Sequence, residues 1–246
     1  MQSAQSLGDH CREIDRRNQR GGRMLSVVDL VEAGTLERDV AAHCIAAVAS
    51  GASFLVGASP GGAGKTTVMG ALLNCVPADV VLRPAVEPLH ADGHRTCWIC
   101  HEIGPGAYYA YLWGEPLRRW FRLSDEGASL ASNLHADTME EVERQVLVQN
   151  DVPRGHLRRI GLVVFIEVRR TAQGWERRVT SVHESDGASD HRLLWDRARG
   201  WRSESRIVAP ARIAQARAWL DEAVKAGVRT IREVRETFLQ GGMGQS

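Results

Sequence analysis

The sequence predicts an α/β fold in which a mainly parallel sheet is covered by helices on both faces. Five short apolar runs recur along the chain, and helical stretches of different lengths separate them. A strand–turn–strand pattern closes the series. Short buried strands that alternate with helices are typical of parallel sheets with two covered faces, and the final pattern predicts a closing β-hairpin. The five runs lie at 54–56, 80–82, 97–100, 129–134 and 162–168.

The composition is that of an ordinary globular protein, because the 246 residues are 43% hydrophobic and 25% charged. This excludes a mostly disordered chain, a collagen-like repeat and a small disulfide scaffold. A formal charge of +1 gives no overall field that would favour nucleic acid. No apolar run approaches the roughly 18 residues that a membrane helix needs, and the polar stretch after Met1 predicts no secretory signal. The five cysteines are expected to be reduced thiols in a cytoplasm.

The chain begins with a polar, arginine-rich arm at 1–23, which we expect to be loose or helical. The apolar spacing from Leu25 predicts a short helix closed by Gly34. Thr35 is then expected to cap a second helix, which ends at Gly51. Later helices are predicted at 65–76, about 106–121 and 139–149, and the hairpin strands at 163–170 and 175–182 around the turn 171–174.

The last fifty residues are predicted to be helical. An apolar stripe at 213, 216, 220 and 224 predicts one helix that ends at Gly227, and Thr230 is expected to cap another. These patterns divide the chain into an N-terminal arm (1–23), a core (24–195) and a C-terminal helical extension (196–246).

The most specific motif lies between the first strand and the helix that follows it. Small residues there let successive backbone N–H groups turn inward around a phosphate, and the helix N-terminus adds partial positive charge. A strand, a glycine-rich loop, Gly-Lys-Thr and a helix together predict a Walker A loop in a P-loop NTPase of the RecA/ASCE-like type. Lys65 would reach the β- and γ-phosphates of ATP, and Thr66 would ligate Mg²⁺. The predicted phosphate-binding residues are Ser59, which replaces the usual first glycine, Pro60, Gly61, Gly62, Ala63, Gly64, Lys65, Thr66 and Thr67.

ATP hydrolysis also needs a carboxylate near the γ-phosphate, which orients or deprotonates water. Glu102 directly follows the third run, at the carboxyl end of a strand that we expect beside the loop strand. Glu115 is the competing candidate, and it could equally be a helix-surface carboxylate beside Arg118 and Arg119. Glu102 is preferred because it keeps the five strands in regular order. His101 stands where many P-loop proteins carry an aspartate.

A zinc site is the alternative function for Cys97-x-x-Cys100, because three histidines lie nearby. No second ligand pair occurs at the spacing of a zinc finger or ribbon. Residues three apart on a strand face opposite sides of the sheet. The pattern therefore favours two buried thiols in a core strand. The three histidines are His90, His94 and His101.

The segment Ser-Asn-Leu-His-Ala-Asp-Thr-Met-Glu-Glu at 132–141 resembles the His box of the type II/IV secretion and pilus-assembly ATPases. The segment at 30–36 is similar to the lead into the motor core of the same family. Residues 160–170, Gly174 and 178–184 are similar to its closing hairpin, so the resemblance covers about 25–195. It implies that His135 contacts the γ-phosphate and couples it to subunit movement. It also implies that Glu87, at the end of a family acidic segment, supports the Mg²⁺ site, and the alternative for Glu87 is a loop carboxylate.

The resemblance implies a cytoplasmic Mg²⁺-dependent ATPase, at or near the inner face of the membrane, that drives protein secretion or pilus assembly. The expected partners are further copies of the chain, in a hexameric ring, and an integral membrane platform protein. About two dozen residues precede the core where the family has a larger domain, so we expect a shortened motor. No motif selects an arginine that would act on a neighbouring subunit.

Two alternatives remain open. A nucleotide-binding regulatory or assembly subunit with weak or absent hydrolysis is suggested by His101 and by the segment 124–127, which replaces a Gly-His pair of the family. A nucleic-acid motor would need a basic patch interleaved with aromatic side chains. The sequence shows no such patch, so no dedicated nucleic-acid site is expected.

Overall fold

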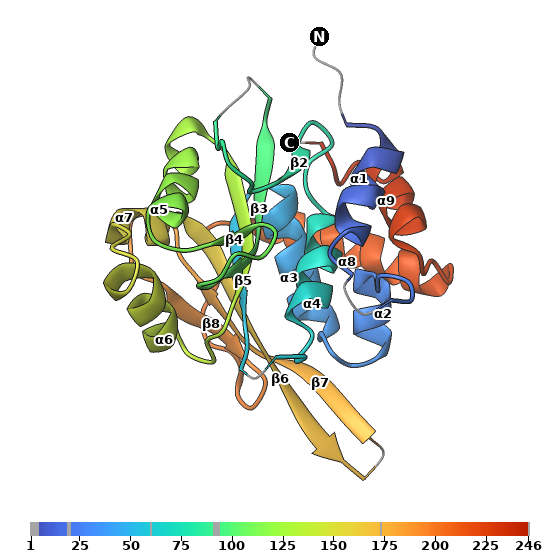
Figure 1. Cartoon of the computed structure of the whole chain (residues 1–246). Helices are drawn as coiled ribbons and strands as arrows, with labels where there is room; N and C mark the ends of the chain where they lie inside the picture. The colour runs from blue at the N-terminus through green and yellow to red at the C-terminus, as the bar shows by residue number, and fades with distance from the viewer. Residues whose placement is uncertain (1–4, 19–20, 60, 91–93, 173, 246) are drawn as a thin grey trace.

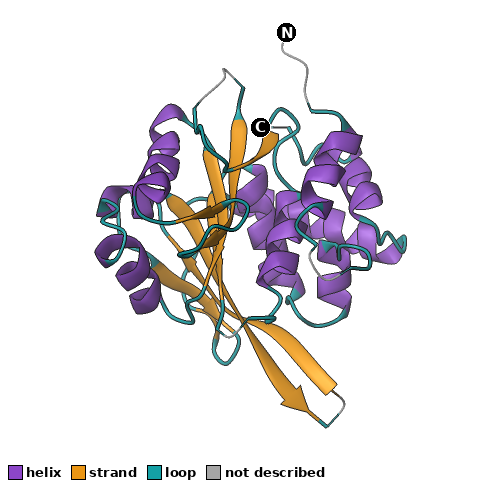
Figure 2. Ribbon diagram, viewed as in Figure 1, coloured by secondary structure: helices purple, strands orange, loops and turns teal. Residues whose placement is uncertain are grey.

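The protein is built around one nine-stranded sheet with helices on both faces (Figures 1 and 2). The structure is a computed structural model, and it describes residues 5–18, 21–59, 61–90, 94–172 and 174–245. The strand order is β2-β3-β5-β1-β6-β7-β8-β9, and β4 pairs with β3. The strands from β2 to β6 run parallel, whereas β7, β8 and β9 are antiparallel additions. The predicted fold class is therefore confirmed. The strands are β1 (Ser53–Gly57), β2 (Val81–Pro84), β3 (Thr96–Ile103), β4 (Tyr111–Leu112), β5 (Ser129–Leu134), β6 (Ile160–Thr171), β7 (Gly174–Glu184), β8 (Arg192–Asp196) and β9 (Gly200–Trp201).

The helices divide into two layers because the central strands are apolar on both faces. In β1, Phe54 and Val56 face one core and Leu55 faces the other, as the alternation of a strand requires. Figure 1 shows α5, α6 and α7 on one side of the sheet and the other helices opposite. The first layer is α5 (Glu115–Arg122), α6 (Met139–Glu143) and α7 (Arg154–Arg158), and the second is α1 (Leu7–Asp15), α2 (Val27–Glu32), α3 (Arg38–Ala49), α4 (Lys65–Leu73), α8 (Pro210–Lys225) and α9 (Ile231–Gln240).

The two ends of the chain contribute helices to the second layer. The side chain of Ile14 in α1 is fully buried, and Arg17 beyond it bonds to Glu13 within the arm. At the other end, Thr230 caps α9 as predicted, in a capping box with Glu233. The arm and the C-terminal helices therefore join one apolar core with α3 and α4. None of the helices in the described residues is both long enough and apolar enough to span a membrane.

Three predicted boundaries are wrong. Helix α3 begins at Arg38, not after a Thr35 cap, because the Thr35 carbonyl accepts a hydrogen bond from the Val179 backbone N–H at 2.8 Å. The helix predicted from 106 begins only at 115, because Gly106, Ala110 and Gly114 have φ of 132°, 55° and 64°, outside the right-handed helix. The region after 195 starts with β9, and its first helix begins only at Pro210.

The end of β1 depends on a glycine. A Cβ atom at Gly57 would lie 2.6 Å from the Ala136 carbonyl oxygen and 2.7 Å from the Phe165 ring. We expect Gly57→Ala to lower the free energy of unfolding by about 1–3 kcal/mol, because the neighbouring backbone must move. Gly155→Ala in α7 is the matched control, since its added Cβ meets nothing within 4 Å beyond its chain neighbours and the backbone of its own helix. Urea unfolding of both variants tests this, and equal stabilities would contradict the expectation.

Candidate functional site

A cavity of about 1070 Å³ opens where β1, β3 and β5 end. Its lining comes from the loop before α4, from the N-terminal segment and from β7. Four of the residues predicted for catalysis or metal binding line this cavity together. They are Lys65, Thr66, Glu102 and His135.

The loop has the backbone of a turn that only glycine adopts easily. Gly62 and Gly64 have φ of 91° and 104°, and Gly64 is the residue that precedes the first turn of α4. The start of the loop is held by Asp137, whose Oδ1 accepts a hydrogen bond from the Ser59 backbone N–H at 2.6 Å. Ser59 thus fits a position where the sequence pattern calls for glycine. Pro60 lies outside the described residues.

Lys65 is buried at the start of α4, and its amine reaches three groups. Its Nζ lies 3.2 Å from the Ala58 carbonyl oxygen, 3.2 Å from His135 Nδ1 and 3.4 Å from Glu102 Oε1. Burial lowers the pKa of the Lys65 ammonium, and the Glu102 carboxylate opposes this change. The loop therefore holds a poorly hydrated cation, whose charge is shared with one carboxylate.

Glu102 lies near the end of β3, at an irregularity in the pairing with β5. The register shifts between Cys100 and Ile103, and the Asn133 side-chain amide donates to the His101 carbonyl oxygen at 3.0 Å. Such a bulge redirects a strand and its side chains. Burial raises the pKa of the Glu102 carboxyl, and Lys65 and His135 oppose the rise.

The order of strands corrects one step of the prediction. Strand β3 does not lie beside the loop strand β1, because β5 runs between them. Glu102 nevertheless reaches Lys65, since the side chain extends past the end of β5. His135 is the first residue after β5, half-exposed, with Nε2 3.7 Å from Glu102 Oε1. The middle strand thus contributes the histidine and the outer strand the acid.

His101 occupies the position before the acid. Its Nε2 atom has no hydrogen-bond partner among the described residues, and its ring meets that of Tyr109 edge-on. Burial lowers the pKa of His101 to about 4. The imidazole is therefore neutral at neutral pH, so it supplies no charge where an aspartate would.

Two predicted or alternative acids lie apart from this cluster. Glu115 is exposed on α5, with ion pairs to Arg118 at 2.9 Å and Arg122 at 2.8 Å. Glu87 pairs with Arg119 at 2.9 Å and does not line the cavity. The structure therefore brings Glu102, and neither of these carboxylates, to Lys65.

The two cysteines of the Cys-x-x-Cys pattern face opposite cores, as predicted for residues three apart on a strand. Burial raises the pKa of Cys97 to about 11 and that of Cys100 to about 12. Protonated thiols on opposite faces of a sheet cannot ligate one ion. No cluster of three potential metal ligands occurs within the part of the chain that the structure describes.

Two residues that contact the loop are not identified by any pattern in the sequence. Asp137, which bonds to the start of the loop, lies inside the segment 132–141. The resemblance of that segment to the His box assigns no particular role to Asp137. Arg177 comes from β7 and donates through Nε to the Gly62 carbonyl oxygen at 3.3 Å. Only the pairing of β7 with β6 brings Arg177 to the loop, so no local pattern could have identified it.

No protein-family model matches the sequence, and no curated protein matches it either. Among solved structures, it is similar to the VirB11 ATPase from the Brucella suis type IV secretion system in complex with sulphate, at 18% identity and a TM-score of 0.43, over 73% of this chain and 62% of that one. It is also similar to the Legionella pneumophila ATPase DotB, at 12% identity and a TM-score of 0.41, over 81% of this chain and 59% of that one. The chain thus spans about three fifths of each structure.

Proposed function

We propose that this chain binds Mg²⁺-ATP and hydrolyses its γ-phosphate. The observation that carries the proposal is the cluster of Lys65, Glu102 and His135, whose polar atoms lie 3.2–3.7 Å apart beside a glycine turn and a helix N-terminus. A buried cation beside a glycine turn and a buried acid of raised pKa are groups that phosphoryl transfer to water uses, and the histidine lies in the same cavity.

The site fits a nucleotide triphosphate in charge and in size. Its volume of about 1070 Å³ is slightly above the roughly 300–1,000 Å³ of ordinary ligand pockets. The turn at Gly62 and Gly64 directs backbone N–H groups toward an anion at the start of α4. The hydroxyl of Thr66 lines the same cavity and is a suitable Mg²⁺ ligand. When bound, the metal ion neutralises charge that develops on the β- and γ-oxygens.

Each residue of the cluster has a distinct role in this proposal. Lys65 binds the β- and γ-phosphates, and in doing so exchanges the Glu102 carboxylate for phosphate oxygens. Glu102 then orients the attacking water and accepts its proton, a task suited to a carboxylate whose pKa is raised. His135 contacts the γ-phosphate from the end of β5.

The wider role that we propose is that of a motor for protein secretion or pilus assembly. The sequence resemblance at 30–36, 132–141 and 178–184 supports this proposal. The protein would work as a hexameric ring on an integral membrane platform, at the cytoplasmic face of the membrane. The second candidate is a regulatory subunit with weak hydrolysis, which is favoured by the neutral His101 beside Glu102.

Hydrolysis of Mg²⁺-ATP by the purified protein, with its mass followed in solution with and without nucleotide, tests these alternatives. We expect turnover together with a nucleotide-dependent ring. Binding without turnover, by a monomer, would instead favour the regulatory subunit. Absence of any nucleotide binding would refute both.

A further inference from the structure

Four arginines line the cavity, and three of them already have a carboxylate partner. The fourth, Arg177, has no carboxylate partner among the described residues. An unpaired guanidinium in a cavity that is predicted to bind an anion is available for that anion. The three pairs are Arg17 with Glu13 at 2.8 Å, Arg23 with Asp29 at 2.6 Å, and Arg178 with Glu176.

Arg177 lies along the loop. In the ladder of β6 and β7 it is opposite Val168, on the sheet face that α4 covers. Its Nε donates to the Gly62 carbonyl oxygen at 3.3 Å, and its Cδ would be 3.2 Å from a Cβ atom at Gly64. The side chain therefore crosses the loop between its two left-handed glycines. Both terminal NH₂ groups lack a hydrogen bond to a described residue.

The cluster around Lys65 does not by itself supply all the positive charge that a bound triphosphate calls for. Lys65 shares its charge with Glu102, so the pair contributes little net positive charge before nucleotide binds. ATP brings one more charged phosphate than ADP. A half-buried guanidinium, whose planar fork matches two phosphate oxygens, is well suited to that additional group.

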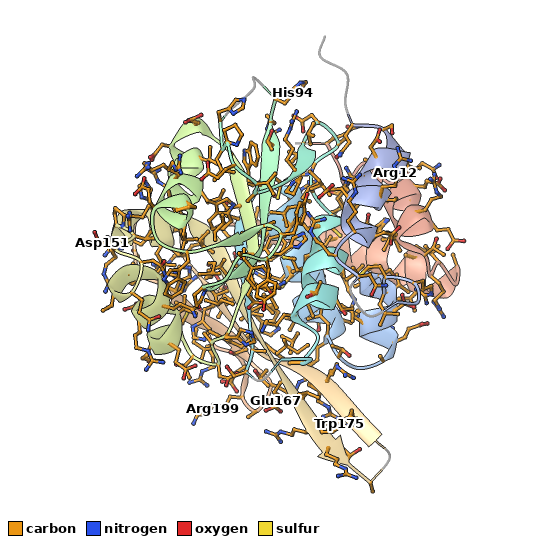
Figure 3. The ribbon with its side chains drawn as sticks, in the orientation of Figure 1. Arg12, His94, Asp151, Glu167, Trp175 and Arg199 are labelled. Carbon is orange, nitrogen blue, oxygen red and sulfur yellow. The ribbon has the colours of Figure 1, made fainter. Side chains whose placement is uncertain are left out.

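Given the ATP binding proposed above, we infer that Arg177 recognises the terminal phosphate of nucleotide bound in its own chain, and that it makes the site prefer the triphosphate to the diphosphate. The contact has a mechanical consequence. Strand β7 belongs to the hairpin that projects from the body of the protein, where Trp175 is labelled (Figures 1 and 3). Loss of the γ-phosphate would therefore break the contact between the hairpin and the nucleotide, while the hydrogen bond from Arg177 Nε to the Gly62 carbonyl oxygen needs no phosphate.

The test is the ratio of two dissociation constants, measured by calorimetry with Mg²⁺ and either a non-hydrolysable ATP analogue or ADP. We expect Arg177→Ala to weaken binding of the ATP analogue about tenfold or more, as for loss of one charge-assisted hydrogen bond, and to leave ADP binding within about twofold. Arg177→Lys keeps the charge but not the planar fork of the guanidinium. Its affinity for the ATP analogue should therefore lie between those of the wild type and Arg177→Ala. Arg199→Ala removes an exposed arginine from the turn after β8 and should match the wild type.

The outcomes separate this inference from the proposed function. An equal loss of ATP-analogue and ADP affinity in Arg177→Ala would show that Arg177 only shapes the loop, and unchanged affinities would show no role at all. Either result overturns the inference while ATP binding stands. A wild-type protein that binds neither nucleotide overturns both. Thermal unfolding without nucleotide checks that each variant is folded, and Arg177→Lys gives the same comparison if the alanine variant does not fold.

Discussion

Lys65→Ala is expected to abolish nucleotide binding, with a loss of affinity for Mg²⁺-ATP of about 100-fold or more. The amine belongs to the first residue of α4, and burial leaves it poorly hydrated, so that phosphate oxygens replace few water contacts when they bind. Calorimetry with Mg²⁺-ATP measures the loss. Lys225→Ala is the matched control, because that side chain is 79% exposed at the end of α8.

The sequence offers a second measurement of the same prediction. It contains 31 basic residues, of which only Lys65 and Lys225 are lysines. Acylation of amines, mapped by mass spectrometry, therefore reports on the loop and on an internal control in one experiment. Mg²⁺-ATP should protect Lys65 and leave the reaction of Lys225 unchanged. Equal reactivity of Lys65 with and without nucleotide would contradict its proposed contact with phosphate.

The sequence predicts those parts of the fold that are determined locally. Strands β1 and β5 are short and largely buried, and the glycine-rich loop occurs between a strand and a helix, so each has its own pattern. The errors occur where contacts between distant segments decide the structure. Strand β4 is two residues long and exists only because β3 pairs with it, and β9 likewise depends on β8.

The same distinction applies to the candidate site. Lys65, Glu102 and His135 were selected because each has a characteristic neighbour in the sequence, and the structure places them in contact. The order of β3, β5 and β1 could not be derived, because buried parallel strands look alike in sequence whatever their position in the sheet. Arg177 has no local signal for a related reason, since its contact with the loop depends on how a hairpin passes the start of α4.

Glu102→Gln is expected to abolish turnover while nucleotide binding is retained. Glutamine has the size of glutamate but cannot accept the proton of the attacking water, so kcat should fall by about 10²–10⁴-fold. Binding should be equal to or tighter than that of the wild type, because the substitution removes the carboxylate that competes for Lys65 at 3.4 Å. Steady-state hydrolysis and calorimetry on the same preparation measure both quantities.

The pH dependence of turnover is an independent test of the role of Glu102. A general base works in its deprotonated form, and burial raises the pKa of this carboxyl above its ordinary value of 4.5. Turnover by the wild type should therefore decline on the acid side at a higher pH than an ordinary glutamate would give. Glu115→Gln should keep both the rate and the profile, because Glu115 bonds Arg118 and Arg122 on the surface of α5. Normal turnover in Glu102→Gln, or loss of turnover in Glu115→Gln, would contradict the assignment of Glu102 as the general base.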